Sequence, residues 1–167
     1  VFTTNFDTLL ERAARQLASR RYGVISDQRN LVGRRGPSII KLHGTIGDPG
    51  SMTLTEDHFR RYPREKAAFV NTVRQSMIEK VFLLIGFSGD DPNFLAWAGW
   101  IRDELGSSAH KIYLCGWLGS GPTERGSVSD SNIVSIDLSQ LPEAAKWRDE
   151  ERHELAIERE DNSRHKL

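Results

Sequence analysis

The stretch Ser38-Ile39-Ile40-Lys41-Leu42-His43-Gly44 decides the fold of this 167-residue chain. It begins as a short apolar run without regular alternation, which is typical of a strand buried on both faces, and it ends abruptly in a histidine and a glycine. Further runs of this kind lie at residues 1–4, 81–85, 111–115 and 133–136. The sequence therefore predicts several short, buried strands.

Segments of helical periodicity separate these runs, and we expect helices over residues 8–21, 64–80 and 93–105. The first is predicted to begin with a capping box formed by Thr8 and Glu11. Its expected buried stripe is Leu9, Leu10, Ala13, Ala14 and Leu17. In the second helix, the expected buried residues are Ala67, Phe69, Val70, Val73 and Met77 or Ile78, and in the third they are Phe94, Leu95, Trp97, Ala98 and Ile101. The alternation of strands and helices predicts an α/β fold, with a Rossmann-like parallel sheet and helices on both faces.

Composition excludes several classes of protein. A single cysteine, Cys115, cannot form an internal disulfide or a four-cysteine zinc cluster, and it favours a reducing, cytoplasmic location. No apolar run approaches the roughly 18 residues of a membrane span, and no signal-peptide pattern opens the chain. Lys and Arg outnumber Asp and Glu in residues 1–80, but no aromatic residues are interleaved with them as in a stacking platform. A solvated basic face is therefore favoured over nucleic-acid binding.

The two ends of the chain suggest how it is organised. Because Val1 already lies within an apolar run, we expect an N-terminal strand to precede it. Residues 1–141 are predicted to form one domain, with a Gly- and Ser-rich loop near residues 116–132. Residues 142–167 are dense in charge and are predicted to form a helical tail or the start of a following segment.

Polar residues follow three of the predicted strands: Asn5 and Asp7, then His43 and Gly44, then Gly86, Ser88, Gly89, Asp90 and Asp91. In an open parallel sheet, ligands bind beyond the carboxyl ends of the strands, so we expect these groups to face one crevice. Structural roles compete with this expectation, because Asp7, Ser88 or Asp91 could cap a helix and Gly86 could serve only a tight turn. A histidine at a strand end can act as a general base, or it can be a structural residue. The other histidines show no paired metal-ligand spacing.

Three motifs in order carry a resemblance. Thr3-Thr4-Asn5-Phe6-Asp7, Lys41-Leu42-His43-Gly44, and Gly86-Phe87-Ser88 with Asp91-Pro92 resemble the ordered motifs of the sirtuin superfamily. Phe6, Phe87 and the Ser-x-x-Asp-Pro continuation are similar to the SIR2-like branch found in bacterial antiviral defence proteins, in which the domain degrades NAD. The resemblance covers roughly residues 1–137.

The resemblance implies a role for each matching residue. Asn5 and His43 would be catalytic, with Asn5 orienting water or a ribose hydroxyl and His43 acting as general base. Thr4, Asp7, Gly86, Phe87, Ser88 and Asp91 would bind NAD, which is the substrate. Thr4 replaces the sirtuin glutamine, and the Gly-rich loop that cradles the pyrophosphate in this family would precede Val1. The resemblance further implies a homo-oligomer or additional domains. No zinc is expected, because Cys115 alone cannot build a four-cysteine zinc module.

The resemblance leaves several functions open. The first is cleavage of the nicotinamide-ribose bond of NAD in antiviral defence, with ADP-ribose or a cyclic form as product and little turnover expected from residues 1–167 alone. The second is an NAD-dependent protein deacylase, disfavoured because such enzymes usually carry a four-cysteine zinc module. The others are a non-catalytic module that binds NAD or ADP-ribose, and an unrelated nucleotide-binding α/β domain.

Overall fold

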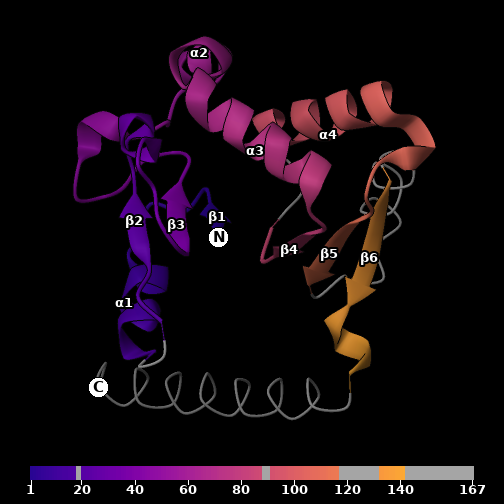
Figure 1. Ribbon diagram of the computed structural model, residues 1–167, viewed down its shortest axis with the longest axis horizontal. Helices are drawn as coiled ribbons and strands as arrows, with labels where there is room; N and C mark the ends of the chain where they lie inside the picture. The colour runs from indigo at the N-terminus through magenta and orange to yellow at the C-terminus, as the bar shows by residue number, and fades with distance from the viewer. Residues whose placement is uncertain (18–19, 88–90, 117–131, 142–167) are drawn as a thin grey trace, which may run out of the picture. The chain divides into compact units, whose positions relative to one another are not determined.

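The structure is a computed structural model that describes residues 1–17, 20–87, 91–116 and 132–141 (Figure 1). Its strands are β1 (Phe2–Thr3), β2 (Gly23–Ile25), β3 (Ser38–Lys41), β4 (Phe82–Ile85), β5 (Ile112–Gly116) and β6 (Ile133–Asp137). Its α-helices are α1 (Leu9–Gln16), α2 (Glu56–Glu65), α3 (Ala67–Glu79) and α4 (Pro92–Leu105). The predicted loop near 116–132 falls almost wholly outside the described residues, and the predicted tail at 142–167 lies entirely outside them. Within the described residues, no helix is both long and apolar enough to cross a membrane.

The chain divides into two compact units, and each contains one three-stranded sheet. The first unit comprises Val1–Ile78 and Asp91–Trp97, and its strands lie in the order β1-β3-β2. All its strand pairs are parallel, with Thr3 opposite Lys41 and Ile25 opposite Ile40. The three-residue strand β2 was not predicted. All four residues of β3 are buried, which confirms the expectation for that strand.

The sheet of the second unit has the order β4-β5-β6 and is again entirely parallel. Every predicted apolar run is thus a strand, and the structure confirms the α/β, Rossmann-like parallel arrangement. The expectation that the strands are buried on both faces is wrong for β4 and β6. Leu83 and Ile85 alternate with half-buried neighbours on β4, and Val134 and Ile136 are also exposed. The described residues do not cover this apolar side of the two strands.

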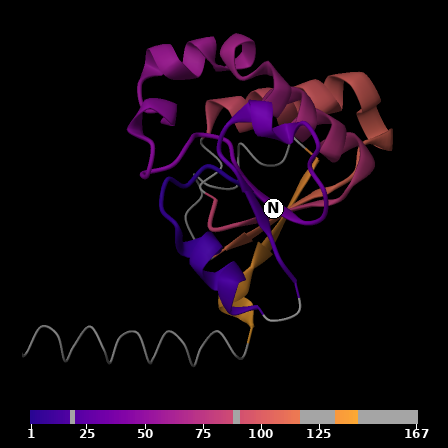
Figure 2. The ribbon, with the colours of Figure 1, turned by 60° about the vertical axis from the view of Figure 1, so that its left-hand side comes forward.

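Helix α4 follows the sequence prediction most closely. It starts at Pro92, which suits the first helical position, and it buries Phe94, Trp97, Ala98 and Ile101, whereas Leu95 is exposed. The predicted helix over 64–80 corresponds mainly to α3, but its first two residues are the end of a separate helix, α2, and the chain changes direction between the two helices (Figure 2). The buried residues of α3 are Phe69, Val70, Val73 and Met77, while Ala67 and Ile78 are exposed. Helix α2 contains Pro63 and many charged residues, so its apolar pattern was too weak to predict it.

Helix α1 reverses its predicted orientation. Leu9, Leu10 and Leu17 are exposed, and the buried residue of the helix is Glu11. Thr8 makes no side-chain capping bond, so the predicted capping box is wrong. The Asp7 carboxylate accepts a hydrogen bond from the backbone N–H of Leu9 at 2.8 Å and starts the helix in its place.

An ion pair within the first unit explains this reversal. The Lys41 ammonium on β3 is 1% exposed and lies 2.9 Å from Glu11 Oε1. It also donates to the backbone carbonyls of Phe6, at 3.4 Å, and Asp7. An ammonium has three protons, and here each has an acceptor, which offsets the cost of removing the charge from water. The pair therefore fixes which side of α1 faces β3.

We predict that Lys41→Met lowers the free energy of unfolding by about 3–5 kcal/mol, because it leaves the buried Glu11 carboxylate without a countercharge. Urea denaturation measures this loss. The double variant Lys41→Met, Glu11→Leu should recover a large part of the loss, since it removes both charges. A cost below about 1 kcal/mol for Lys41→Met would contradict this account of α1.

Candidate functional site

Asn5 and His43 leave adjacent parallel strands at the same edge of the first sheet. Thr3 of β1 and Lys41 of β3 are register partners, and the backbone N–H of Leu42 donates to the Thr3 carbonyl at 2.9 Å. Asn5 comes two residues after Thr3, and His43 comes two residues after Lys41. The pairing of Thr3 with Lys41 therefore brings both predicted catalytic residues to one edge of the sheet. Asn5 is exposed and His43 is 4% exposed.

Backbone and side-chain bonds hold the loop that carries Asn5. The Asn5 N–H donates to Thr3 Oγ1 at 3.1 Å. The Phe6 carbonyl accepts from the backbone N–H of Ile46 at 2.9 Å and from the hydroxyl of Thr45 at 3.5 Å, in addition to Lys41. Thr45 and Ile46 follow directly after His43 and Gly44. The loops after β1 and β3 are therefore joined to each other, which fixes Asn5 relative to the strand that carries His43.

His43 packs against two aromatic side chains of α2. Its ring meets Phe59 edge-on, with centroids 5.1 Å apart, and Tyr62 in the same manner at 5.5 Å. The Tyr62 hydroxyl donates to the Leu42 carbonyl at 2.8 Å, and the Tyr62 ring lies 6.4 Å from that of Trp97. Sequence reasoning missed Phe59 and Tyr62 because it did not predict α2. Their spacing of three residues is the signal that could have found them.

Asp91 is the charged partner of His43. Its Oδ2 lies 3.5 Å from His43 Nε2, and its side chain is 11% exposed. Burial lowers the pKa of the His43 imidazole, and the Asp91 carboxylate opposes that shift. Because the net shift is downward, His43 is mostly neutral at pH 7, which is the form that can accept a proton. Within the described residues, His43 Nε2 is a buried atom without a hydrogen-bond partner.

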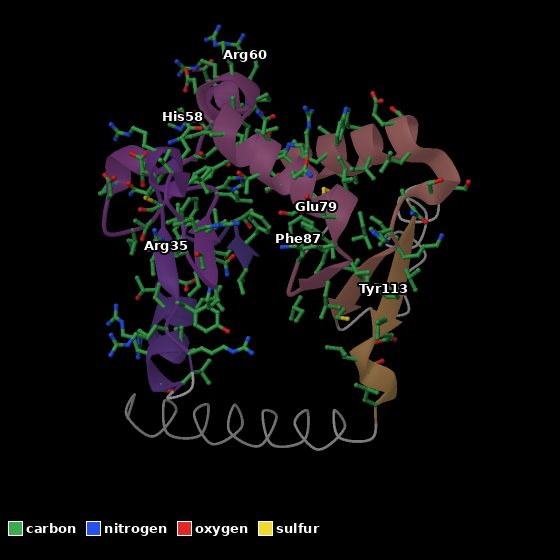
Figure 3. The ribbon with its side chains drawn as sticks, in the orientation of Figure 1. Arg35, His58, Arg60, Glu79, Phe87 and Tyr113 are labelled. Carbon is green, nitrogen blue, oxygen red and sulfur yellow. The ribbon has the colours of Figure 1, made fainter. Side chains whose placement is uncertain are left out.

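The remaining predicted site residues are placed in different ways. Thr4 and Asp7 lie in the loop that carries Asn5, and Asp7 also starts α1. Gly86 and Phe87 belong to the second unit and follow β4 directly (Figure 3). Gly86 adopts a positive φ of 62°, which agrees with the turn expected there. Ser88 lies outside the described residues.

Asn93 is a buried polar residue that sequence reasoning did not select. It stands in the first turn of α4, two residues after Asp91, and is 5% exposed. Its Nδ2 has no hydrogen-bond partner among the described residues. The described residues contain no cluster of His, Cys, Asp or Glu side chains that could hold a metal ion.

Gly44 gives the His43 loop its turn. It has φ +89°, and a Cβ placed on it would lie 2.4 Å from the carbonyl oxygen of Ser51. The Ser51 backbone cannot easily retreat, because its N–H is bonded to the Asp48 carbonyl at 3.0 Å. Glycine is therefore required after His43 both for its backbone angle and for space.

We predict that Gly44→Ala destabilises the protein by more than the 1–2 kcal/mol or so that a left-handed backbone alone costs. The matched control is Gly47→Ala, where no described atom lies within 4 Å of the added Cβ and the backbone imposes no positive φ, so the expected change is within about 0.5 kcal/mol. Urea denaturation compares the two variants. Equal unfolding midpoints would show that the close approach to Ser51 is not a constraint.

Comparison with known proteins gives related sequences. The chain is 32% identical over 95 residues to the NAD(+) hydrolase ThsA of Acinetobacter baumannii (strain 532279), and these residues make up 55% of this chain and 20% of that protein. It is 30% identical over 95 residues to the NAD(+) hydrolase ThsA of Bacillus cereus (strain MSX-D12), with the same shares covered. A third ThsA, from Cytobacillus dafuensis, is 27% identical over 114 residues, or 67% of this chain and 23% of that protein.

The chain thus spans about a fifth of the length of the curated relatives that it matches. The model of the SIR2-like domain family matches residues 1–136. This range is most of the chain and contains all three motifs. This match confirms the resemblance seen in those motifs. The chain belongs to the SIR2-like domain family.

Proposed function

We propose that this SIR2-like domain cleaves the bond between nicotinamide and ribose in NAD, releasing nicotinamide and ADP-ribose. The single observation that carries the proposal is the pair formed by Asn5 and His43. An exposed amide and a buried, neutral imidazole leave adjacent strands at one sheet edge, on loops bonded to each other. The similar proteins are named NAD(+) hydrolase, which supports the same chemistry.

In the proposed reaction the C–N glycosidic bond breaks, and nicotinamide departs with its electron pair as a neutral molecule. Positive charge develops on the ribose, and the oxygen of a water molecule bonds to the anomeric carbon. One proton of that water passes to the His43 imidazole and then to solvent. The Asn5 amide orients the water, since it can donate and accept hydrogen bonds without ionising. Positioning and proton transfer of this kind supply the rate gain.

The resemblance implies that the other predicted residues bind NAD. Asp7 would support the nicotinamide side, Gly86 and Ser88 would contact the adenosine side, and Thr4 and Phe87 would also bind the substrate. Asp91 lies next to His43 within the first unit. Gly86 has φ +62°, and among the described residues nothing lies within 4 Å of where a Cβ would stand, so both its backbone angle and its lack of a side chain suit close approach by a ligand.

Protein deacylation is the second candidate function. It uses the same bond cleavage but places an acyl-lysine peptide where water would attack. The chain offers no observation that favours it. Its single cysteine, Cys115, is buried in β5 and cannot build the four-cysteine zinc module usual in such enzymes. Hydrolysis is therefore the better supported proposal, ahead of a module that binds NAD without turnover.

We predict that His43→Ala and Asn5→Ala each reduce NAD consumption by at least about 10²-fold, since one removes the base and the other the orienting amide. The assay follows nicotinamide release by the purified product of the complete open reading frame. His110→Ala and Asn71→Ala are matched controls at exposed positions and should keep wild-type rates. His43→Gln, which better preserves the volume of the buried side chain, guards against loss of folding.

Persistent nicotinamide release in both site variants would refute the assignment. Formation of acetylated ADP-ribose from an acetyl-lysine peptide would favour deacylation, and tight NAD binding by calorimetry without turnover would favour the binding module. A role in antiviral defence remains a prediction from the family resemblance. Phage plating on cells that carry wild-type protein or His43→Ala tests it, with protection expected from the wild type alone.

A further inference from the structure

We propose that Asp91 is a positioning residue for His43. One oxygen of the Asp91 carboxylate starts helix α4, and the other stabilises the protonated imidazole of His43. This inference rests on the proposed function, in which His43 accepts a proton. It assigns Asp91 a task beyond the contact with NAD that the sequence suggested. His43, Asp91 and the residues packed against them all belong to the first unit.

The two carboxylate oxygens of Asp91 have separate partners. Oδ1 accepts hydrogen bonds from the backbone N–H groups of Asn93, at 2.9 Å, and Phe94, at 3.2 Å. These bonds cap the first turn of α4 and fix the direction of the carboxylate. Oδ2 is thereby held 3.5 Å from His43 Nε2. A residue that served only as a helix cap would need no such second contact.

Protonation changes the bonding of the His43 ring. A neutral imidazole carries hydrogen on one nitrogen, whereas the imidazolium carries it on both. Nε2 is buried and has no partner among the described residues, and 3.5 Å is too long for a normal hydrogen bond. The imidazolium carries Nε2–H whichever ring nitrogen takes up the proton, and this N–H can donate to Asp91 Oδ2 after a small movement. The carboxylate therefore favours the charged form that proton transfer creates.

The aromatic surroundings of His43 strengthen the electrostatic effect of Asp91 on the imidazole. Phe59 and Tyr62 of α2 cover the ring with aromatic carbon, so the charge of Asp91 is poorly screened there. Tyr62 is the other titratable group against the ring, and burial together with the Asp91 charge raises the pKa of its phenol, which keeps it neutral. On β3 itself, the Lys41 ammonium is already paired with Glu11. Asp91 is thus the charge placed to act on His43.

Asp91→Asn separates the two tasks. Asparagine caps helices about as well as aspartate, so the start of α4 should be preserved while the negative charge is lost. We expect the urea midpoint to stay close to that of the wild type. Burial then acts unopposed, so the pKa of His43 should fall further below its ordinary value. The acidic limb of kcat/KM should move to lower pH, and kcat should fall by about tenfold with little change in KM.

The experiment uses the product of the complete open reading frame. NMR titration of the histidine ring signals reports the pKa of His43 directly, with its signal assigned from His43→Gln, and it requires no activity. Asp91→Ala should show the same titration shift together with a lower urea midpoint, because it also loses the cap. Asp103→Asn is the matched control, since this exposed carboxylate of α4 pairs with Arg102 and should leave titration and rate unchanged.

An unchanged His43 titration in Asp91→Asn overturns the inference, whether or not the protein consumes NAD. So does a variant whose KM alone rises, because that result would make Asp91 a binding residue only. If no variant or wild type consumes NAD, the proposed function fails, and the NMR titration alone decides whether Asp91 acts on His43.

Discussion

The first unit depends on the buried ammonium of Lys41. A charge in the interior is tolerated only where its protons are all accepted and an opposite charge lies close. Glu11 supplies the charge, and the carbonyls of Phe6 and Asp7 supply the other acceptors. One side chain of β3 therefore links helix α1 and the loop before it to the sheet, in addition to the strand pairing of β1, which has only two residues.

This constraint reaches the candidate site because of where the acceptors lie. Phe6 and Asp7 directly follow Asn5, and Lys41 precedes His43 by two residues on β3. Burial requires Lys41 to find these acceptors, and the resulting bonds restrain the backbone next to both predicted catalytic residues. The Phe6 carbonyl adds the bond to Ile46, beyond His43, so the two loops constrain each other. Stability and site geometry rest on the same group of atoms.

The sequence predicted the parts of the fold that depend on local pattern. Runs such as Ser38–Lys41 and the helix after Pro92 are recognisable because their own residues decide burial. Helix α1 was misjudged because its burial is decided by Lys41, thirty positions along the chain from Glu11. Apolar periodicity carries no information about a buried charge pair. Strand β2 was too short, and α2 too charged, to show a pattern at all.

The same distinction applies to the site. The position of His43 at a strand end was visible in the sequence, but its environment was not, because Phe59 and Tyr62 come from the helix that was not predicted. That environment bears on the general-base role proposed for His43. Aromatic burial keeps the imidazole neutral and ready to accept a proton, yet it also opposes the positive charge that acceptance creates. A general base in such surroundings needs a carboxylate near enough to stabilise the imidazolium. The carboxylate must not be so closely bonded that the ring is already protonated before the reaction. A separation of 3.5 Å between Asp91 Oδ2 and His43 Nε2, with the carboxylate restrained by the start of α4, meets both requirements.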